Sequence, residues 1–207
     1  MIESTRLAGG GTLIYEPAFF PANEAASLFD TLRREAPWKQ EVGRGRPFPR
    51  LTAWYADEGL AYRYSGVVHP PRALTPRLDE IRATVEAASA VAFNSVLANL
   101  YRDGRDSVGW HRDSDYEHGG QPMIASVSFG AVRRFQIRAD RGRSRAAVDL
   151  ESGSLLLMEG EAVDRWWHCV PKTARSVGLR INLTFRHMGE RGITRESDSA
   201  RSRPLPA

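Results

Sequence analysis

The spacing of hydrophobic positions in the first part of the chain is typical of helices separated by short strands. Apolar residues recur at roughly helical spacing over positions 23–35, and a proline at position 37 follows, so we predict a helix over 23–35. A second helix is predicted over 74–90. Short apolar runs predict strands over 12–16 and 51–56.

The second part of the chain alternates between apolar and polar positions, and Gly and charged residues punctuate the alternating segments. Strands are predicted over 95–101, 123–130, 133–138, 147–150, 154–159 and 178–187. Two helices followed by about six consecutive short strands favour a mostly β protein with flanking helices. The predicted core is an antiparallel sandwich or double-stranded β-helix (jelly roll), with the helices packed outside it.

The chain shows no internal repeat and no linker that would divide it. Its 207 residues are enough for one domain with a sizeable core. We predict a single domain over 1–188, in which 1–93 form an N-terminal extension with helices and 94–188 form the jelly-roll core. The remaining residues, 189–207, are rich in Arg, Ser and Pro, and we expect a mobile tail.

The composition is that of a globular protein outside the membrane. No apolar run approaches the ~20 residues needed to span a bilayer, and the N-terminus lacks the pattern of a signal peptide. We therefore expect a cytoplasmic protein with no membrane partner. Cys169 is the only cysteine, which excludes intramolecular disulfides and multi-cysteine zinc sites, and we interpret it as a small buried thiol.

The positive charge of the chain comes almost entirely from arginine. Of 29 basic residues only Lys39 and Lys172 are lysines, and the pI is near 9.6. The planar guanidinium suits phosphate and carboxylate better than a lysine charge does, so the composition indicates a polyanionic partner. A genome rich in G and C would produce the same bias, so this indication is weak when taken alone.

Two histidines and an aspartate have the spacing of a metal site. In the segment GWHRDSD, His111 and Asp113 are two residues apart, so on a strand both side chains would face the same side. His168, in DRWWHCVPK, is suited to be the third ligand from a neighbouring strand. Such a set is the facial triad of non-haem Fe(II) oxygenases. An H-x-D pair alone also fits two surface residues. We interpret the other histidines as surface or satisfied core residues: His69, His118 and His187.

The last predicted strand, GLRINLTFRHM, has a cleanly polar face and a cleanly apolar face. The polar face consists of Arg180, Asn182, Thr184 and Arg186. This face would usually be turned to solvent. If it instead lined the interior of a jelly roll, its two arginines would need anionic partners, which a dicarboxylate such as 2-oxoglutarate supplies. Asn99 and Tyr101 share one face of the strand SVLANLY and fit the second interpretation.

These segments together resemble a known family. The segments are NLYRDGRDSVGWHRD, IASVSFGAVRRFQIR, GSLLLMEG, WWHCVPK and RINLTFR, and in this order they look like the AlkB family of 2-oxoglutarate-dependent dioxygenases. The upstream PRLTAWYADEGLAYRYSG looks like the branch that repairs nucleic-acid bases. The resemblance runs from Pro49 to Arg186, and the conserved order of several motifs makes it more specific than any one of them.

The resemblance implies three sets of site residues. The iron ligands, and thus the catalytic centre, would be His111, Asp113 and His168. The 2-oxoglutarate site would be lined by Asn99, Tyr101, Arg180, Asn182, Thr184 and Arg186. The flipped base and its surroundings would be contacted by Arg50, Trp54, Tyr62, Tyr64, Ser114 and Asp115. Because adjacent strand residues face opposite ways, we expect at least one of Trp54 and Tyr55 to lie in the core instead.

Within these sets the resemblance assigns individual roles. Arg180 would hold the distal carboxylate of 2-oxoglutarate, and Arg186 would lie near the end that chelates the metal. Tyr64 would stack on the flipped base opposite His111, and Asp115 would lie near the polar edge of the base.

The sequence also departs from the family pattern. Ala56 stands where the family has glycine, and Ser114 and Asp115 stand where two acidic residues often follow the metal aspartate. Val42 is nearest to the position at which some relatives carry an aromatic wedge. The basic segment 138–145 fits a phosphate-binding hairpin and a solvated loop equally well.

The resemblance implies an enzyme with Fe(II) as cofactor and 2-oxoglutarate and O2 as cosubstrates. It would couple decarboxylation of 2-oxoglutarate to hydroxylation of the alkyl group on a base, with release of an aldehyde. We expect alkylated DNA as the substrate, with RNA left open, and a monomeric protein. One alternative is the same chemistry on a protein or a small molecule. A jelly roll that only binds nucleic acid is disfavoured, because a pure binder does not need metal ligands.

Overall fold

The computed structural model describes residues 2–8, 10–43, 45–60, 62–64, 67–69, 71–113, 122–139 and 145–189, with only the backbone given for 62–64 and 67–69. Several predicted features therefore lie outside the described residues. They are Ser114, Asp115, the side chains of Tyr62 and Tyr64, the hairpin tip at 140–144 and the tail from 190 onward.

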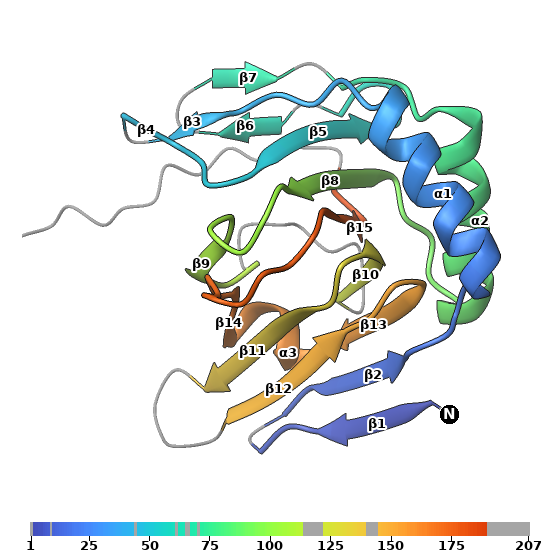
Figure 1. The fold of residues 1–207 in the computed structure, drawn as a ribbon. Coiled ribbons are helices and arrows are strands. Elements are labelled where there is room, and N and C mark those ends of the chain that lie inside the picture. The colour runs from blue at the N-terminus through green and yellow to red at the C-terminus, as the bar shows by residue number, and fades with distance from the viewer. Residues whose placement is uncertain are drawn as a thin grey trace, which may run out of the picture.

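Two antiparallel sheets face each other and form the body of the protein (Figure 1). The large sheet has seven strands, in the spatial order β1 (Glu3–Arg6), β2 (Thr12–Glu16), β13 (Ser154–Glu159), β10 (Met123–Gly130), β15 (Arg180–Arg186), β8 (Ser95–Tyr101) and β5 (Leu51–Ala56). The small sheet has four, in the order β12 (Arg145–Leu150), β11 (Arg133–Ala139), β14 (Trp166–Val170) and β9 (Val108–His111). The predicted jelly roll with flanking helices is thereby confirmed.

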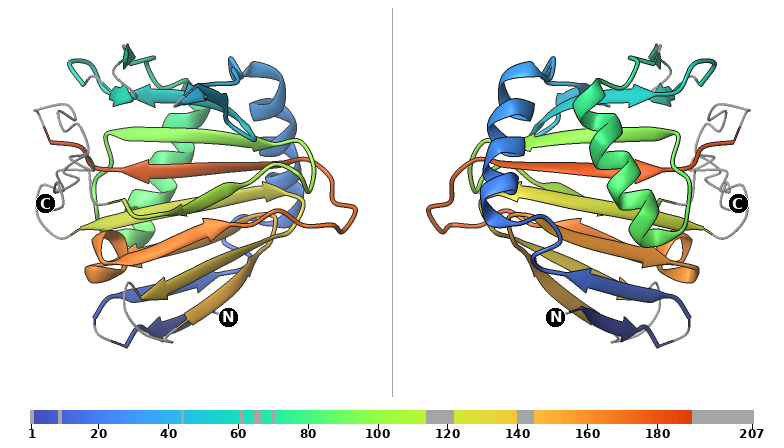
Figure 2. Two further views of the ribbon diagram at one scale, coloured as in Figure 1. Left: turned by 90° about the vertical axis from the view of Figure 1, so that its left-hand side faces the viewer. Right: turned by 90° about the vertical axis from the view of Figure 1, so that its right-hand side faces the viewer.

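Two helices cover the outer face of the large sheet, as the right-hand view of Figure 2 shows. They are α1 (Ala22–Glu35) and α2 (Pro76–Ser89). Helix α2 begins where the Thr75 side chain accepts a hydrogen bond from the Leu78 N–H and where Pro76 occupies the first turn. Helix α1 ends at Ala36, which is extended because a proline follows it.

The large sheet has apolar side chains on both of its faces, and these make two separate cores. Toward the helices, Ile181, Leu183 and Phe185 of β15 pack with Leu28 and Ile81 and show at most 4% exposure. Toward the small sheet, a second core gathers around Ile124, Phe135, Ile137, Leu156 and Trp166. The polar face of β15 therefore points into the space between the sheets and not to solvent.

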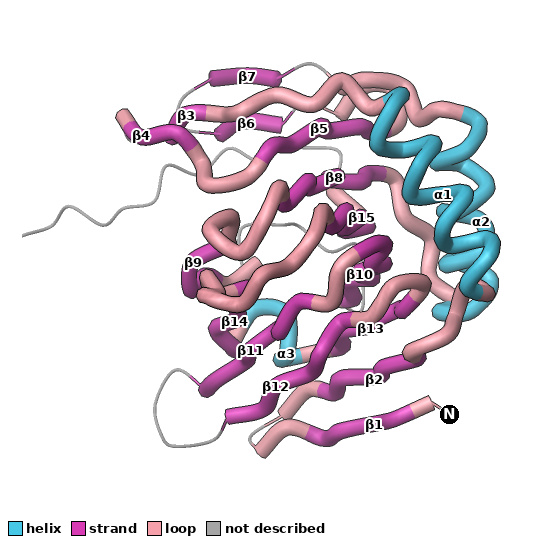
Figure 3. Tube along the Cα trace, viewed as in Figure 1, coloured by secondary structure: helices cyan, strands magenta, loops and turns pink. Residues whose placement is uncertain are grey.

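Short elements complete the fold. Helix α3 (Glu161–Asp164) joins β13 to β14, and two small hairpins lie beyond β5, at the top of Figure 1. One hairpin pairs β3 (Val42–Gly43) with β4 (Arg46–Pro47), and the other pairs β6 (Tyr62–Tyr64) with β7 (Val67–His69). Figure 3 shows that loops make up much of the chain on the side of the molecule opposite α1 and α2. Among the described helices, none is long and apolar enough to span a membrane.

The predicted elements agree closely with the observed ones. Five predicted strands match residue for residue, namely β2, β5, β8, β10 and β13, and both predicted helices are present. The segment before residue 94 contributes β1, β2 and β5 to the same large sheet as the predicted core. The division at residue 94 and the single domain over 1–188 stay predictions.

Gly130, the last residue of β10, packs closely against helix α1 and should not tolerate a side chain. Its φ is +88°, and an added Cβ would meet the carbonyl oxygen of Leu179 and, at 2.8 Å, the ring of Phe29. Left-handed geometry costs roughly 1–2 kcal/mol for a residue with a Cβ, and overpacking adds about 1–3 kcal/mol. We predict that Gly130→Ala lowers the free energy of unfolding by both contributions, as measured by urea denaturation.

Gly59 provides the matched control, since its φ is +86° but an added Cβ would meet nothing within 4 Å. Gly59→Ala should lose only the smaller, conformational contribution. Equal losses in the two variants would mean that the contact with Phe29 and Leu179 is not tight.

Candidate metal and cosubstrate site

A bulge in β9 brings one metal-ligand candidate into the space between the sheets. Val108 pairs with Val170 and His111 pairs with His168, so three steps along β9 match two along β14. The extra residue of a bulge shifts the alternation of a strand by one. As a result both Val108 and His111 line the same cavity, which regular alternation would not allow.

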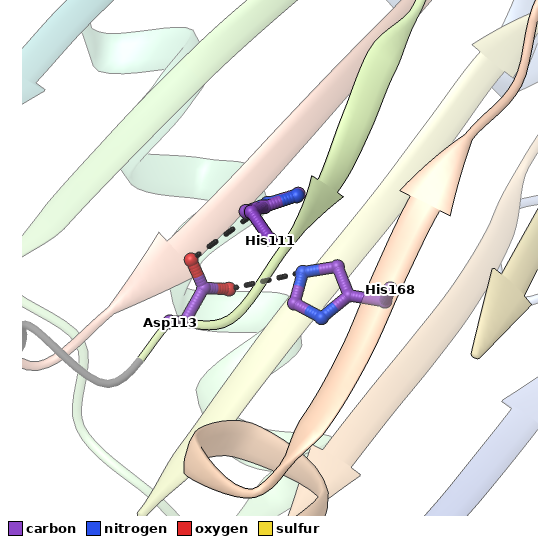
Figure 4. Close-up of side chains that lie close together, drawn as sticks. All are labelled: His111, Asp113 and His168. Carbon is purple, nitrogen blue, oxygen red and sulfur yellow. Dashed lines mark ion pairs between the residues drawn. The ribbon is translucent and has the colours of Figure 1, made fainter. Parts of the chain in front are cut away.

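The three predicted ligands converge, although they come from two strands and a loop. His111 ends β9, Asp113 follows two residues later, and His168 lies on the neighbouring β14 (Figure 4). His111 Nε2 is 4.0 Å from Asp113 Oδ1, and His168 Nε2 is 3.4 Å from Asp113 Oδ2. One ligand atom from each residue lies within 4.8 Å of the others. The arrangement leaves a common point that a metal ion could occupy.

Hydrogen bonding orients the ring of His111. Its Nδ1 lies 2.9 Å from the carbonyl oxygen of Gly109, to which it can only donate. The lone pair is therefore on Nε2, the atom that faces Asp113. The Nδ1 of His168 has no hydrogen-bond partner among the described residues, and its Nε2 also faces Asp113.

The charges around Asp113 keep the ligands in the forms that bind a metal. Burial alone would raise the pKa of Asp113, but the charge of Arg186, 3.2 Å away, and the contact with His168 more than offset it and hold the pKa well below its ordinary value. Burial and the neighbouring His168 lower the pKa of His111 to about 4. At neutral pH the site thus offers a carboxylate and a neutral imidazole, as metal binding requires.

A cavity of ≈ 70 Å³ lies against these three residues. Its apolar walls come from Leu97, Val108, Phe135, Leu156, Met158 and Val170. Its polar walls include five of the six residues predicted for 2-oxoglutarate, namely Asn99, Tyr101, Asn182, Thr184 and Arg186. The sequence-predicted metal and cosubstrate residues are therefore brought together around one space.

Arg180 is the sixth of these residues and lies deeper than the others. It is fully buried and does not line the cavity, but Tyr101, which does, packs 5.0 Å from its Cζ. Its Nη2 donates to the Ser128 hydroxyl at 2.9 Å, whereas Nε and Nη1 have no hydrogen-bond partner among the described residues. Burial lowers the pKa of this guanidinium, which lacks a carboxylate partner in the described part of the chain. A buried cation with open N–H groups favours an anion nearby.

A second buried arginine, Arg133, was not predicted from the sequence. It donates to the carbonyl oxygens of Asp103, Asp106 and Pro171 at 2.7–3.1 Å and so holds two loops together. Its Cζ lies 5.4 Å from the ring of Tyr101, so this ring packs against two guanidinium groups. The only sequence signal was its place on the inward face of the strand that carries Phe135.

The residues predicted to contact the base divide into separate locations. Arg50 lines the cavity, and its Nε donates to Asn99 Oδ1 at 2.7 Å. Trp54 lies opposite Leu97 on the next strand but packs against a small cluster that includes Leu60 and is absent from the described cavity wall. Tyr55 is in the core, as expected for one member of the Trp54–Tyr55 pair.

The hairpins carry the remaining candidates. The backbone of Tyr62 and Tyr64 forms β6, and Val42 on β3 is 59% exposed. An exposed apolar residue on a projecting hairpin agrees with the expected position of Val42, while its contact with a substrate stays a prediction. Cys169 is buried as expected, and burial raises the pKa of its thiol.

Comparison with known proteins gives one consistent family. Residues 12–186 match the family model of the 2OG-Fe(II) oxygenase superfamily. The chain is 42% identical to alpha-ketoglutarate-dependent dioxygenase alkB homolog 3 of Bos taurus and 39% identical to that of Homo sapiens, over 82% of this chain in both cases. It spans 64% of the length of each of these two relatives, which is less than two thirds.

Two further comparisons agree. The chain is 38% identical to the DNA oxidative demethylase ALKBH2 of Homo sapiens, over 81% of this chain and 70% of that protein. The solved structure of OsALKBH1 has the same fold, with a TM-score of 0.69 at 15% identity over 90% of this chain and 100% of that one.

The expected cofactor and cosubstrates are confirmed at the level of the family, because its members use Fe(II), 2-oxoglutarate and O2. The His–Asp–His ligands line the cavity, and the buried Arg180, which packs behind Tyr101, supplies the cation that a carboxylate requires. The chain belongs to the 2OG-Fe(II) oxygenase superfamily and, within it, to the AlkB family.

Proposed function

We propose that this protein oxidatively removes alkyl groups from nucleic-acid bases, with DNA as the first substrate to test and RNA as the second. The observation that carries the proposal is the cavity that joins the His–Asp–His triad to the polar face of β15. Support for the substrate comes from relatives named as DNA oxidative demethylases and from the net charge of +4.

The triad fits iron by its donor set. Two imidazoles and one carboxylate from one side of an ion leave the opposite positions open for a bidentate cosubstrate and O2. In this proposal His111, Asp113 and His168 hold the metal, and Arg186 keeps the carboxylate of Asp113 ionised and oriented through the 3.2 Å contact.

Arg180 fits the distal carboxylate of 2-oxoglutarate. Two of its N–H donors have no partner among the described residues, and a carboxylate is the planar acceptor that a guanidinium binds best. Tyr101 connects Arg180 with the cavity, since its ring packs against the guanidinium of Arg180 and also lines the cavity. Arg186 is already next to Asp113, which supports a place near the metal end of the cosubstrate.

The protein's contribution to the reaction is positioning and shielding. When bound, the iron, 2-oxoglutarate and O2 together supply oxidation of the alkyl carbon, coupled to decarboxylation of the cosubstrate. The apolar cavity wall around Phe135, Leu156 and Met158 limits access of water to that reaction. The C–N bond of the hydroxylated alkyl group then breaks and the group leaves as an aldehyde. The electron pair of that bond stays on the base nitrogen, and the hydroxyl proton is released.

A base reaches such a cavity only after it has left the stack. Flipping costs a few kcal/mol, least for a damaged base that pairs poorly, and stacking on aromatic side chains recovers about 1–3 kcal/mol. The β6–β7 hairpin, which carries Tyr62 and Tyr64, and the β3–β4 hairpin, which carries Val42, both lie beyond β5 (Figure 1). We assign base stacking to Tyr64, with Tyr62, Trp54, Arg50, Ser114 and Asp115 as further contacts.

The first prediction concerns substrate turnover. Wild-type protein with Fe(II), 2-oxoglutarate and O2 should release formaldehyde from oligonucleotides that carry 1-methyladenine or 3-methylcytosine. These lesions block Watson–Crick pairing and so lower the cost of flipping. Asp113→Asn keeps the shape of the ligand but removes its charge. Mutation of a residue that only hydrogen-bonds to a metal ligand typically lowers activity about 10–100-fold. Because Asp113 is itself a ligand in this proposal, the activity of the variant should fall by at least about 100-fold.

The same assay separates the competing functions. Formaldehyde from single- or double-stranded DNA, or from RNA, identifies the preferred nucleic acid. If the wild-type protein decarboxylates 2-oxoglutarate but releases no formaldehyde from any of these substrates, base repair is wrong and a protein or small-molecule substrate takes its place.

The second prediction compares the two buried arginines. Arg180→Met removes a buried charge with two open donors, so without cosubstrate the variant should be as stable as wild type or more stable, by up to about 4 kcal/mol. Arg133→Met leaves three carbonyl groups without their donor and should destabilise by about 1–3 kcal/mol for each carbonyl group that water does not reach. Urea unfolding in the absence of ligands measures both values.

Ligand binding supplies the control for this comparison. Mn(II) with 2-oxoglutarate should raise the melting temperature of wild-type protein, because ligands that bind only the folded state stabilise it. Arg180→Met should respond to Mn(II) but lose most of the further rise with 2-oxoglutarate. An Arg180→Met protein that keeps the full response, or that loses as much stability as Arg133→Met, contradicts the role given to Arg180.

A further inference from the structure

The outer face of the small sheet carries tryptophans and arginines directly behind the metal ligands. His111 and His168 face the cavity, whereas their neighbours in sequence, Trp110, Arg112 and Trp167, belong to the opposite face. Trp110 is 38% exposed and is one of four large apolar side chains exposed in the described part of the chain. Arg138 of β11 lies opposite Trp167 in the register.

The four side chains interleave across three strands. The Cζ of Arg112 lies 4.8 Å from the ring centroid of Trp167, and the Cζ of Arg138 lies 4.5 Å from that of Trp110. Each indole therefore has a guanidinium over it. We call the surface made by Trp110, Arg112, Arg138 and Trp167 the Trp–Arg face.

The Trp–Arg face keeps its positive charge. Within the described residues neither Arg112 nor Arg138 forms an ion pair, and the exposed Arg145 lies opposite Arg138 on β12. Arg134, also on β11, differs, because its guanidinium is paired with Asp149 at 2.6 Å. Along β11 the outer face thus changes from a neutralised pair at Arg134 to unpaired cations at Arg138 and the facing Arg145, within the described residues.

The Trp–Arg face also borders the cavity. Strand β9 is the edge strand of the small sheet, and Arg112 stands between two metal ligands in the chain. The His111 side chain is 39% exposed, so the cavity opens on the side of this edge strand. A polymer lying on the face could pass around β9 to the cavity mouth.

We propose that the Trp–Arg face binds the single-stranded nucleic acid that flanks the target base. Arg112 and Arg138 contact backbone phosphates, and the indole of Trp110 accepts an unpaired base by stacking. Alternating aromatic planes and cations are the features by which proteins hold single strands without regard to sequence. This inference rests on the proposed function, because it assigns the flanking strand of the same substrate to a surface outside the cavity.

The chemistry favours this occupant over a protein. Trp and Arg are also enriched in protein interfaces, so the charge decides between the two occupants. Arg112 and Arg138 form no ion pair within the described residues, and a phosphate backbone supplies the negative charge that they lack.

The test measures binding of an undamaged, fluorescein-labelled single-stranded oligonucleotide by anisotropy over a series of NaCl concentrations. The variant is Arg112→Gln with Arg138→Gln. Loss of two phosphate contacts should reduce the slope of log Kd against log salt by about 1.4, at ~0.7 per phosphate. The matched control is Arg33→Gln with Arg34→Gln on α1, which removes the same charge on the other side of the molecule (Figure 1) and should leave the slope unchanged.

Stacking is tested by a second pair of variants. Trp110→Ser should weaken binding by roughly 5-fold to 150-fold, which corresponds to about 1–3 kcal/mol per stacked base, while Trp110→Phe should retain most of the affinity. Each variant is checked for its thermal response to Mn(II) with 2-oxoglutarate. If the double variant loses that response, Arg138→Gln alone replaces it, because Arg138 is distant in sequence from the metal ligands.

The outcomes distinguish this inference from the proposed function. Unchanged slopes in the double variant, or equal changes in it and in the α1 control, overturn the Trp–Arg face even if the enzyme demethylates oligonucleotides. Binding through the face without formaldehyde release from methylated strands supports the face and overturns base repair. A wild-type dimer that Trp110→Ser converts to monomers would show that a second copy covers the face, and would also overturn the inference.

Discussion

Arg180, Arg186 and Asp113 place three charges in the space between two sheets, where water cannot neutralise them. The Arg186–Asp113 contact at 3.2 Å balances two of these charges and keeps the carboxylate ionised for a metal. Arg180 has no carboxylate beside it in the described residues. Its buried positive charge is therefore neutralised only when an anion binds next to it. The burial of strand β15 therefore favours an anionic group beside Arg180.

The two faces of the small sheet carry different groups: the metal-ligand histidines on the inner face and the Trp–Arg face on the outer one. The bulge in β9 turns His111 toward the cavity, and β14 places His168 beside it. Trp110, Arg112 and Trp167, which neighbour these ligands in sequence, face outward and form the Trp–Arg face together with Arg138. Because a strand has two faces, two short strands can hold the metal on one side and, by our inference, the flanking nucleic acid on the other.

The sequence predicted those parts of the protein that depend on alternation within one strand. β8 and β15 have opposite faces of different polarity, and this pattern also identified five residues of the cavity wall: Asn99, Tyr101, Asn182, Thr184 and Arg186. β1 was missed because all four of its residues are exposed, so only pairing with β2 makes it a strand. Arg133 was missed because its partners are carbonyl groups of distant loops, and the Trp110–Arg138 contact because it depends on register across three strands.

The metal and cosubstrate sites are tested by a crystal structure of the protein with Mn(II) and 2-oxoglutarate, grown without iron. We expect one anomalous peak between His111 Nε2, the Asp113 carboxylate and His168 Nε2, and the next contact follows from the open donors of Arg180. The distal carboxylate of 2-oxoglutarate should contact the Nε or Nη1 of Arg180, while the keto-acid end chelates the metal near Arg186. A metal bound elsewhere, or a 2-oxoglutarate that leaves both open donors of Arg180 without a partner, would contradict these sites.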